Sequence, residues 1–361
     1  MSIAYRVVQW NHHKRVYDAI LAGAIVGYLV IFVAAGMVLF RAPEDIAPPI
    51  LLMRALGTCA LILLHVILMI GPVHRLTPVV APLLYNRRHM GVMFFTVALL
   101  HAVVAIGFYG GFGVGNPIVN VLGHGSFASI AAFPFEWLGF LALVIFFVMA
   151  ATSHDFWLKN LGPRAWKAIH MGVYLAYALV LAHVVLGALQ SDRSIAYPIL
   201  MGIGFIAVVS VHVIAAAREA KRDTSGPMVD SATQWIDVAA VADIPESRAL
   251  VVCPRGGGPR ERIAVFRHEG GVSAVSNVCA HQGGPLGEGK ILDGCITCPW
   301  HGYQYRAHDG QSPPPFTEKI PTYRVRITAG RMEVNPTPLP PGTPVEPARV
   351  PLASGAAPPD A

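Results

Sequence analysis

Two short motifs in the C-terminal third of the chain combine cysteine and histidine at close spacing. Cys279 and His281 stand in VCAHQGGPL, and Cys298 and His301 stand in CPWHGYQY. Thiolate and imidazole groups bind transition metals, so this set of four predicts a metal site, with structural zinc and an iron–sulfur cluster as the two alternatives. Glycine and proline in both motifs indicate loops between short strands.

A second set of candidate ligands lies in the long apolar stretches of the first 216 residues. Ionisable side chains are costly inside a membrane, and those that occur there mark functional positions. Histidine is also a common axial ligand of haem iron; the structural alternative is a set of neutral histidines that hydrogen-bond neighbouring helices. The set comprises Arg54, His65, His74, His89, His101, His170, His183 and His212.

The spacing of these histidines predicts two haem levels. His170 and His183 are 13 residues apart, which is about 20 Å along a helix and places one ligand in each leaflet. His101 follows Arg88 by 13 residues. Its depth therefore matches that of His183, and the two are expected to hold an outer haem.

The inner haem has His170 as one predicted ligand and His89, by depth, as the other. However, the 12-residue spacing between His89 and His101 corresponds to a rotation of about 120° on a straight helix, so these two do not share a face. His65 and His74 are therefore alternatives to His89, and a five-coordinate inner haem is another.

Six apolar stretches are long enough to carry these ligands across a membrane, which takes about 20 residues each. They cover about 18–40, 50–72, 88–110, 134–152, 165–189 and 196–216. Of the 27 basic and 21 acidic side chains, only 15 lie in residues 17–216. This distribution excludes both a single soluble globule and a disordered chain. We expect the first stretch to be a retained span, since no cleavage site follows the basic N-terminus.

Basic residues alternate between the loops. Three precede the first stretch, and three stand in each of the loops after the second, fourth and sixth, which makes 12, whereas the intervening loops hold only Arg41 and Arg193. Cytoplasmic loops are enriched in lysine and arginine, so both termini are predicted to be cytoplasmic. The same residues explain much of the net charge of +6 without a nucleic-acid partner.

The runs YNRRHMGVMFFTVALLH and WLKNLGPRAWKAIHMGVYLAYALVLAH resemble the ferric-reductase-type transmembrane domain, over roughly residues 20–215. That family includes ferric reductases, NADPH oxidases and the haem subunit of the bacterial periplasmic methionine-sulfoxide reductase system. The resemblance implies a six-helix haem-binding bundle in which His101, His170 and His183 are haem ligands. The NADPH-oxidase pattern has a wider spacing on the third helix than His89–His101.

From Trp235 onward the pattern changes to short strands rich in valine and isoleucine, bounded by glycine, proline and aspartate, which indicates an all-β domain. The expected organisation is a cytoplasmic N-terminal segment, a transmembrane haem domain, a linker, the β domain and a disordered proline-rich tail. Their boundaries are 1–17, 18–216, 217–232, 233–336 and 337–361.

The order Cys-x-His followed by Cys-x-x-His, together with GGPL and CPWHG, resembles a Rieske domain over about residues 233–336. The resemblance implies a [2Fe–2S] cluster with Cys279 and Cys298 on one iron and His281 and His301 on the other.

Three further positions refine this resemblance. Gly284 and Trp300 stand where cytochrome bc-type Rieske proteins have a disulfide, so the domain is closer to the ferredoxin type and suits a reducing cytoplasm. Tyr305 stands where bc-type proteins have a tyrosine that donates a hydrogen bond to a cluster ligand. The serine of that pattern is replaced by Tyr303.

The chain has no nucleotide-binding fingerprint, so we do not expect it to oxidise NADH or NADPH alone. The sequence predicts an oxidoreductase or electron-transfer component of the bacterial inner membrane: an all-α six-helix bundle with two b haems plus a small all-β [2Fe–2S] domain. Electrons would pass outward from a cytoplasmic reductase or ferredoxin-type donor to ferric iron, a quinone or a periplasmic redox protein. The alternatives are a quinol dehydrogenase that serves a cytoplasmic oxygenase, and a redox sensor with a non-catalytic membrane domain.

Overall fold

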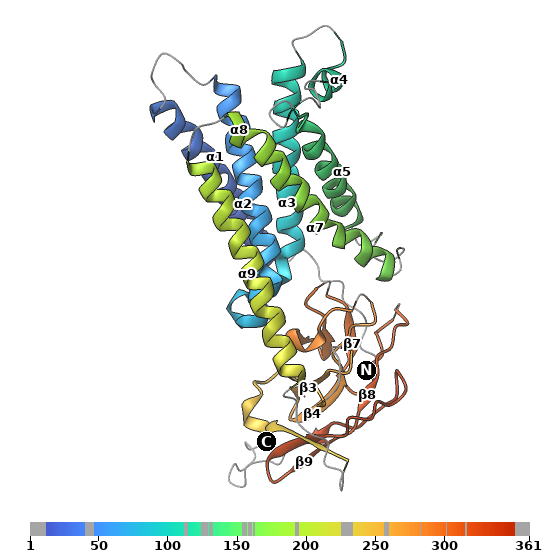
Figure 1. Ribbon diagram of the computed structural model, residues 1–361. Helices are drawn as coiled ribbons and strands as arrows, with labels where there is room; N and C mark the ends of the chain where they lie inside the picture. Colours follow the sequence, from blue (N-terminus) through green and yellow to red (C-terminus); the bar gives the residue numbers. More distant parts are fainter. Residues whose placement is uncertain are drawn as a thin grey trace. The chain divides into compact units, whose positions relative to one another are not determined.

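The computed structural model describes residues 12–39, 47–111, 115–123, 129, 133–153, 157, 161, 163–191, 195–224, 234–255, 260–281, 283–300, 302–314 and 316–350. The described chain divides into two compact units, and the boundary in the sequence lies between Ala215 and Ala216. The first unit is helical and the second consists mainly of strands (Figure 1).

Long helices dominate the first unit. In the described residues they are α1 (His12–Leu39), α2 (Pro48–Leu76), α3 (Ala81–Ala105), α5 (Glu136–Thr152), α7 (Pro163–Leu186) and α9 (Ala196–Thr224). Short elements join them: η1 (Pro78–Val80), a π-helical turn η2 (Ile106–Gly110), α4 (Pro117–Leu122) and α8 (Ala188–Ser191). Five helices of the described chain are long and apolar enough to cross a membrane. The sixth, α5, is apolar but has 17 residues, about 25 Å. The predicted all-α membrane bundle is confirmed.

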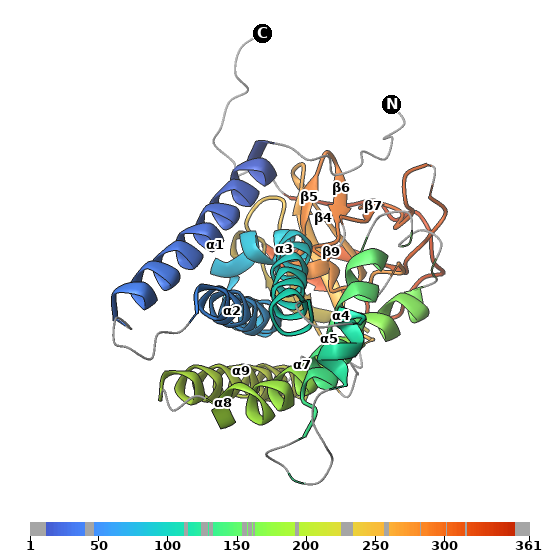
Figure 2. The ribbon, with the colours of Figure 1, turned by 90° about the horizontal axis from the view of Figure 1, so that it is seen from above.

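Helix α2 lies at the centre of the bundle. It packs along α3, while α5 packs along α7, and α1 lies against α2 (Figure 2). In the most apolar stretch of α2, 56% of the residues are buried, whereas in that of α1 only 6% are buried. The rings of Phe94 and Phe146 meet edge to face at 4.8 Å and connect α3 to α5. The exposed aliphatic side chains of α1 suit a lipid-facing helix.

The second unit contains antiparallel sheets of short strands. β1 (Ile236–Ala240), β10 (Arg331–Val334) and β9 (Val325–Thr328) form one sheet in that order. A larger sheet has the order β11 (Ala348–Arg349), β4 (Gly271–Ser276), β3 (Ile263–His268) and β2 (Ala249–Val252), with β8 (Thr322–Tyr323) paired to β4. The third sheet contains β5 (Lys290–Leu292), β6 (Cys295–Thr297) and β7 (Gln304–Arg306).

Strand β3 is buried on both faces, and its two faces serve different cores. Ile263 and Val265 pack in a cluster with β1 and β10. Ala264 and Phe266 pack in a second cluster that contains Cys279 and Cys298. Because successive side chains of a strand point to opposite faces, β3 separates the cysteine-bearing core from the rest of the domain.

The linker expected at 217–232 begins inside a helix. Helix α9 continues to Thr224, so residues 217–224 are helical, and residues 225–232 lie outside the described residues. The physical reason is local: Ala, Arg, Glu and Lys of the run AREAK have high helix propensity. In addition, Glu219 forms an ion pair with Arg262 of the β unit, which fixes this end of the helix.

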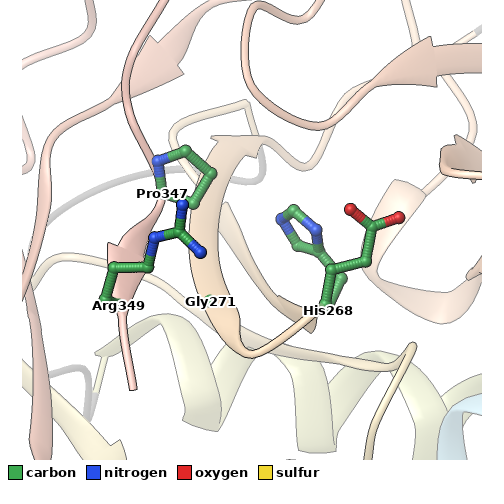
Figure 3. A pocket seen from close by; sticks show the side chains of 5 residues that line it. His268, Gly271, Pro347 and Arg349 are labelled. Atoms are coloured by element: carbon green, nitrogen blue, oxygen red, sulfur yellow. The ribbon is translucent and has the colours of Figure 1, made fainter. Parts of the chain in front are cut away.

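The tail expected to be disordered from residue 337 is ordered as far as Val350. Its backbone NH groups at Leu339, Gly342 and Val345 donate to carbonyl oxygens of Thr322, Ile320 and His308. Its last described residues form β11 on β4, where Pro347 and Arg349 line a small pocket with His268 and Gly271 (Figure 3). Proline favours an extended backbone and lacks only its own NH, so the segment still pairs as a strap. Residues 351–361 lie outside the described residues.

Candidate metal centres

The two cysteine–histidine loops of the β unit pack directly against each other. The first loop follows β4 and closes through a hydrogen bond from the Cys279 NH to the Gly284 carbonyl, 2.9 Å. The second follows β6 and closes through a bond from the Cys298 NH to the Tyr303 carbonyl, 2.8 Å. A Cβ placed on Gly284 would lie 2.8 Å from Cys298 Sγ. Glycine is therefore needed at this position for the loops to meet.

The predicted ligands in these loops are buried. Cys279, His281 and Cys298 are 2%, 7% and 1% exposed, and the two cysteines belong to the same buried cluster. The fourth predicted ligand, His301, lies outside the described residues. No disulfide joins any of the cysteines in the described residues. Gly284 and Trp300 are neighbours across the two loops, since a Cβ on Gly284 would lie 3.1 Å from the Trp300 ring.

A buried tyrosine hydroxyl contacts one predicted cysteine ligand. The Tyr305 hydroxyl lies 3.3 Å from Cys279 Sγ, a hydrogen-bonding distance for sulfur. Tyr305 is fully buried, and burial, followed by the charge of the Cys279 thiolate, raises the pKa of its hydroxyl. The hydroxyl therefore stays protonated and can donate a hydrogen bond to a cysteine thiolate, as the resemblance to Rieske domains implied.

Tyr303 covers the ring of His281. The two rings are stacked with centroids 4.6 Å apart and an interplanar angle of 7°. The Tyr303 hydroxyl donates a hydrogen bond to the Glu318 carboxylate. This contact was absent from the sequence-based prediction, because Glu318 lies far along the chain and no spacing rule connects it to the ligand motifs.

In the helical unit, His101 of α3 and His183 of α7 face each other. Their ring centroids are 6.4 Å apart, at an interplanar angle of 86°. His101 Nδ1 donates to the Met53 carbonyl at 3.0 Å, and His183 Nδ1 donates to the Phe135 carbonyl at 2.9 Å. Because a carbonyl oxygen can only accept, both Nδ1 atoms carry the hydrogen, and both Nε2 atoms present a lone pair.

This arrangement fits a six-coordinate haem iron. Two imidazole nitrogens that each bind one iron at about 2.0 Å place their ring centroids about 6 Å apart, close to the 6.4 Å between His101 and His183. Ligating histidines also donate their second NH to a carbonyl or carboxylate. Two glycines make room for the rings: a Cβ on Gly57 would lie 3.1 Å from His101, and one on Gly139 would lie 2.8 Å from His183.

His170 occupies the opposite end of α7. Its Nδ1 donates to the Trp166 carbonyl at 3.0 Å, its Nε2 lies 3.4 Å from the Ser153 hydroxyl, and its ring stacks on Trp166. Ser153 caps the end of α5 and Phe135 caps its beginning. The two histidines of α7 therefore contact opposite ends of α5.

The two candidates for the second inner ligand have different environments. His89 Nδ1 lies 3.0 Å from both carboxylate oxygens of Asp18 on α1. His65 is buried on α2, and its Nε2 lies 3.0 Å from the Tyr177 hydroxyl. The structure records no ring contact between His170 and either of them in the described residues. Asp18 and Tyr177 were not singled out from the sequence, although a carboxylate in an apolar helix is itself a signal.

Comparisons with known proteins match the two units separately. Residues 56–181 match the family of ferric reductase-like transmembrane components, and residues 234–324 match the Rieske [2Fe–2S] domain. The chain is 30% identical over 173 residues to the protein-methionine-sulfoxide reductase heme-binding subunit MsrQ of Caulobacter vibrioides, covering 48% of this chain and 76% of that protein.

Relatives of the second unit are of two kinds. The ferredoxin component of a naphthalene 1,2-dioxygenase system from Pseudomonas aeruginosa is 30% identical over 103 residues, 28% of this chain and 95% of the ferredoxin. A cholesterol 7-desaturase of Xenopus laevis is 40% identical over 78 residues, which are 21% of this chain and only 17% of that enzyme.

Proposed function

Because the chain belongs to the ferric reductase-like transmembrane family and carries a C-terminal Rieske [2Fe–2S] domain, we propose that it transfers electrons between a cytoplasmic cluster and b haems, towards an acceptor at the outer face. The observation that carries the proposal is the facing pair His101 and His183, with both Nδ1 atoms held by backbone carbonyls. A polar arrangement of this kind inside an apolar bundle is costly unless it binds something.

We assign the cluster to Cys279, His281, Cys298 and His301. Burial of the three described ligands and the close approach of the two loops at Gly284 support this assignment. A Rieske cluster supplies one-electron transfer. The protein residues hold it, and Tyr305 donates a hydrogen bond toward Cys279 Sγ, which stabilises the reduced, more negative state.

We assign the outer haem to His101 and His183 and the inner haem to His170 and His89. The Asp18 carboxylate holds His89 Nδ1, which leaves Nε2 for a metal, as in other carboxylate–histidine–metal arrangements. His65 is the weaker alternative because its Nε2 is engaged by Tyr177. Haem iron supplies one-electron chemistry at each level.

The direction of transfer in this proposal is outward. A soluble cytoplasmic reductase or ferredoxin-type donor loads the cluster, because the chain has no nucleotide fingerprint of its own. The acceptor is ferric iron, a quinone or a periplasmic redox protein. The positive loops that alternate with neutral ones support cytoplasmic termini in a bacterial inner membrane.

Quinol oxidation is a second candidate, and one observation favours it. The Tyr174 hydroxyl of α7 lies 3.3 Å from His212 Nε2 of α9, and Tyr174 is 45% exposed on a membrane helix. Tyr174 is one helical turn from His170. Phenol and imidazole groups open to lipid suit the head group of a quinol, whose oxidation releases two electrons to haem and two protons.

Purified full-length protein tests the main proposal. The pyridine haemochrome assay should report b haem, and low-temperature EPR should report a Rieske signal after reduction. Zinc in place of iron, with no Rieske signal, contradicts the proposal. Haem reduction by a short-chain quinol separates the two directions: the second candidate requires it to be fast and slowed in Tyr174→Phe, but not in the control Tyr109→Phe.

A further inference from the structure

The Glu318 carboxylate is not a predicted ligand, but it is linked to the predicted cluster ligand His281 through the ring of Tyr303. The Tyr303 ring is stacked on His281, and its hydroxyl donates to Glu318. Tyr303 is 4% exposed, so the Glu318 carboxylate is bonded to a buried phenol.

Glu318 is held in this position by the backbone as well as by Tyr303. Its carboxylate accepts a hydrogen bond from the Thr317 NH at 3.1 Å, and its own carbonyl accepts one from the Ser312 NH at 2.9 Å. Ser312 in turn belongs to the segment that the C-terminal strap covers, since Gln311 donates to the Gly342 carbonyl. The carboxylate is therefore fixed near the site.

Tyr303 also completes an aromatic enclosure on this side of the site. Its ring meets Phe316 at 5.1 Å and 64°, and Tyr305 at 5.4 Å and 47°. Such packing covers the face of His281 on which Tyr303 stacks. A charge acts more strongly across a region without water than across solvent, so the half-buried Glu318 charge acts on the site more strongly than a fully solvated charge would.

We propose that Glu318, held by Tyr303, is a positioning and charge-setting residue that lowers the reduction potential of the cluster; this rests on the cluster ligation proposed above. A fixed negative charge disfavours the addition of an electron to a nearby centre. The loop that carries Glu318 thus makes the cluster a stronger reductant, which suits a donor that sends electrons into membrane haems.

The test is a redox titration of the full-length protein, followed by the EPR signal of the reduced cluster. In Glu318→Gln the equilibrium constant for reduction should rise about tenfold, which is 59 mV for a one-electron couple. Tyr303→Phe keeps the stacked ring but removes the hydroxyl that holds the carboxylate on the side of His281, so the potential should rise in the same direction, by less than in Glu318→Gln, with a near-native EPR line shape. Glu246→Gln removes the same charge from an ion pair with Arg267 and should leave the potential unchanged.

The outcomes are distinguishable. If Glu318→Gln and Glu246→Gln have the same reduction potential, the Glu318 charge does not set the potential. That result overturns the inference but not the proposed presence of the cluster. A Tyr303→Phe potential equal to wild type shows that Tyr303 does not hold the charge, and also overturns it. If the wild-type protein gives no Rieske signal, the proposed function fails and the inference fails with it.

Discussion

The imidazole rings of His101 and His183, from helices α3 and α7, face each other with centroids 6.4 Å apart. Each ring is oriented by a backbone carbonyl from a third element, Met53 of α2 and Phe135 before α5. Four parts of the bundle therefore orient the two rings, and each Nε2 atom keeps a lone pair. The outer haem that we propose for this pair would account for two polar rings inside an apolar unit.

Replacing single histidines should separate the two haem levels. His101→Ala and His183→Ala should each remove the outer haem, because either leaves one axial position empty. His170→Ala and His89→Ala should remove the inner haem. The measurement is haem content per chain with the optical spectrum of the remaining haem. If His65→Ala, and not His89→Ala, removes the inner haem, the inner ligand comes from α2.

The glycine that faces His183 should also be needed for full occupancy of the outer haem. A Cβ on Gly139 would lie 2.8 Å from His183 Nδ1, so Gly139→Ala should displace the ring and reduce outer-haem occupancy several-fold. Gly91→Ala is the matched control, since nothing lies within 4 Å of its Cβ. Equal haem content in the two variants would contradict the assigned site.

Tyr305 should raise the reduction potential of the cluster. Its hydroxyl lies 3.3 Å from Cys279 Sγ, and hydrogen bonds to the sulfur ligands favour the reduced state. Tyr305→Phe should therefore lower the potential, opposite in sign to the Glu318→Gln change, by a similar order of magnitude. EPR-monitored redox titration measures it, and an unchanged potential would show that the bond does not form in the cluster-bound protein.

His268 should make the stability of the β unit depend on pH. It is buried beside Ser273. Burial lowers its pKa from the ordinary value of 6.5, although the charges of Glu269 and Glu246 act in the opposite direction. As the pH falls below about 6.5, the unfolded state takes up a proton on His268 that the folded state does not, so the free energy of unfolding decreases. Above that pH, the stabilising contribution of the buried, neutral ring is fully present.

The midpoint temperature for loss of the cluster absorbance, measured on the full chain from pH 8 to pH 5, checks this dependence. His268→Gln should flatten the decrease below about pH 6.5, because the titrating group is gone. His308→Gln, at a position where the side chain is 52% exposed, is the matched control and should retain the wild-type curve. A wild-type slope in His268→Gln would assign the dependence to other groups.

Hydrophobic length and histidine spacing predicted the bundle and the facing pair, because both depend on regular helix geometry. The same geometry correctly predicted that His89 and His101 do not share a face: His89 turns to Asp18 of α1 and His101 to α2 and α7. Contacts between distant segments were not predictable in this way. Glu318 reaches Tyr303 only because the chain folds back after β7, and no periodicity encodes that return.

The ordered strap was also missed, for a related reason. Proline-rich composition lowers the expectation of regular structure, but residues 337–350 are held by hydrogen bonds to carbonyls more than 10 positions away in the sequence. The end of α9 was placed too early because its polar run AREAK was interpreted as a linker, although its residues favour a helix.

The central claim is that electrons pass between the cluster and the haems of one chain. Sealed vesicles that expose the Rieske domain should be mixed with a membrane-impermeant one-electron reductant, and haem reduction followed by stopped-flow absorbance. We expect fast haem reduction in the wild type and at least a tenfold slower rate in Cys279→Ser, with unchanged haem content. Equal rates in the two proteins would show that the haems receive electrons without the cluster, which contradicts electron transfer from cluster to haem.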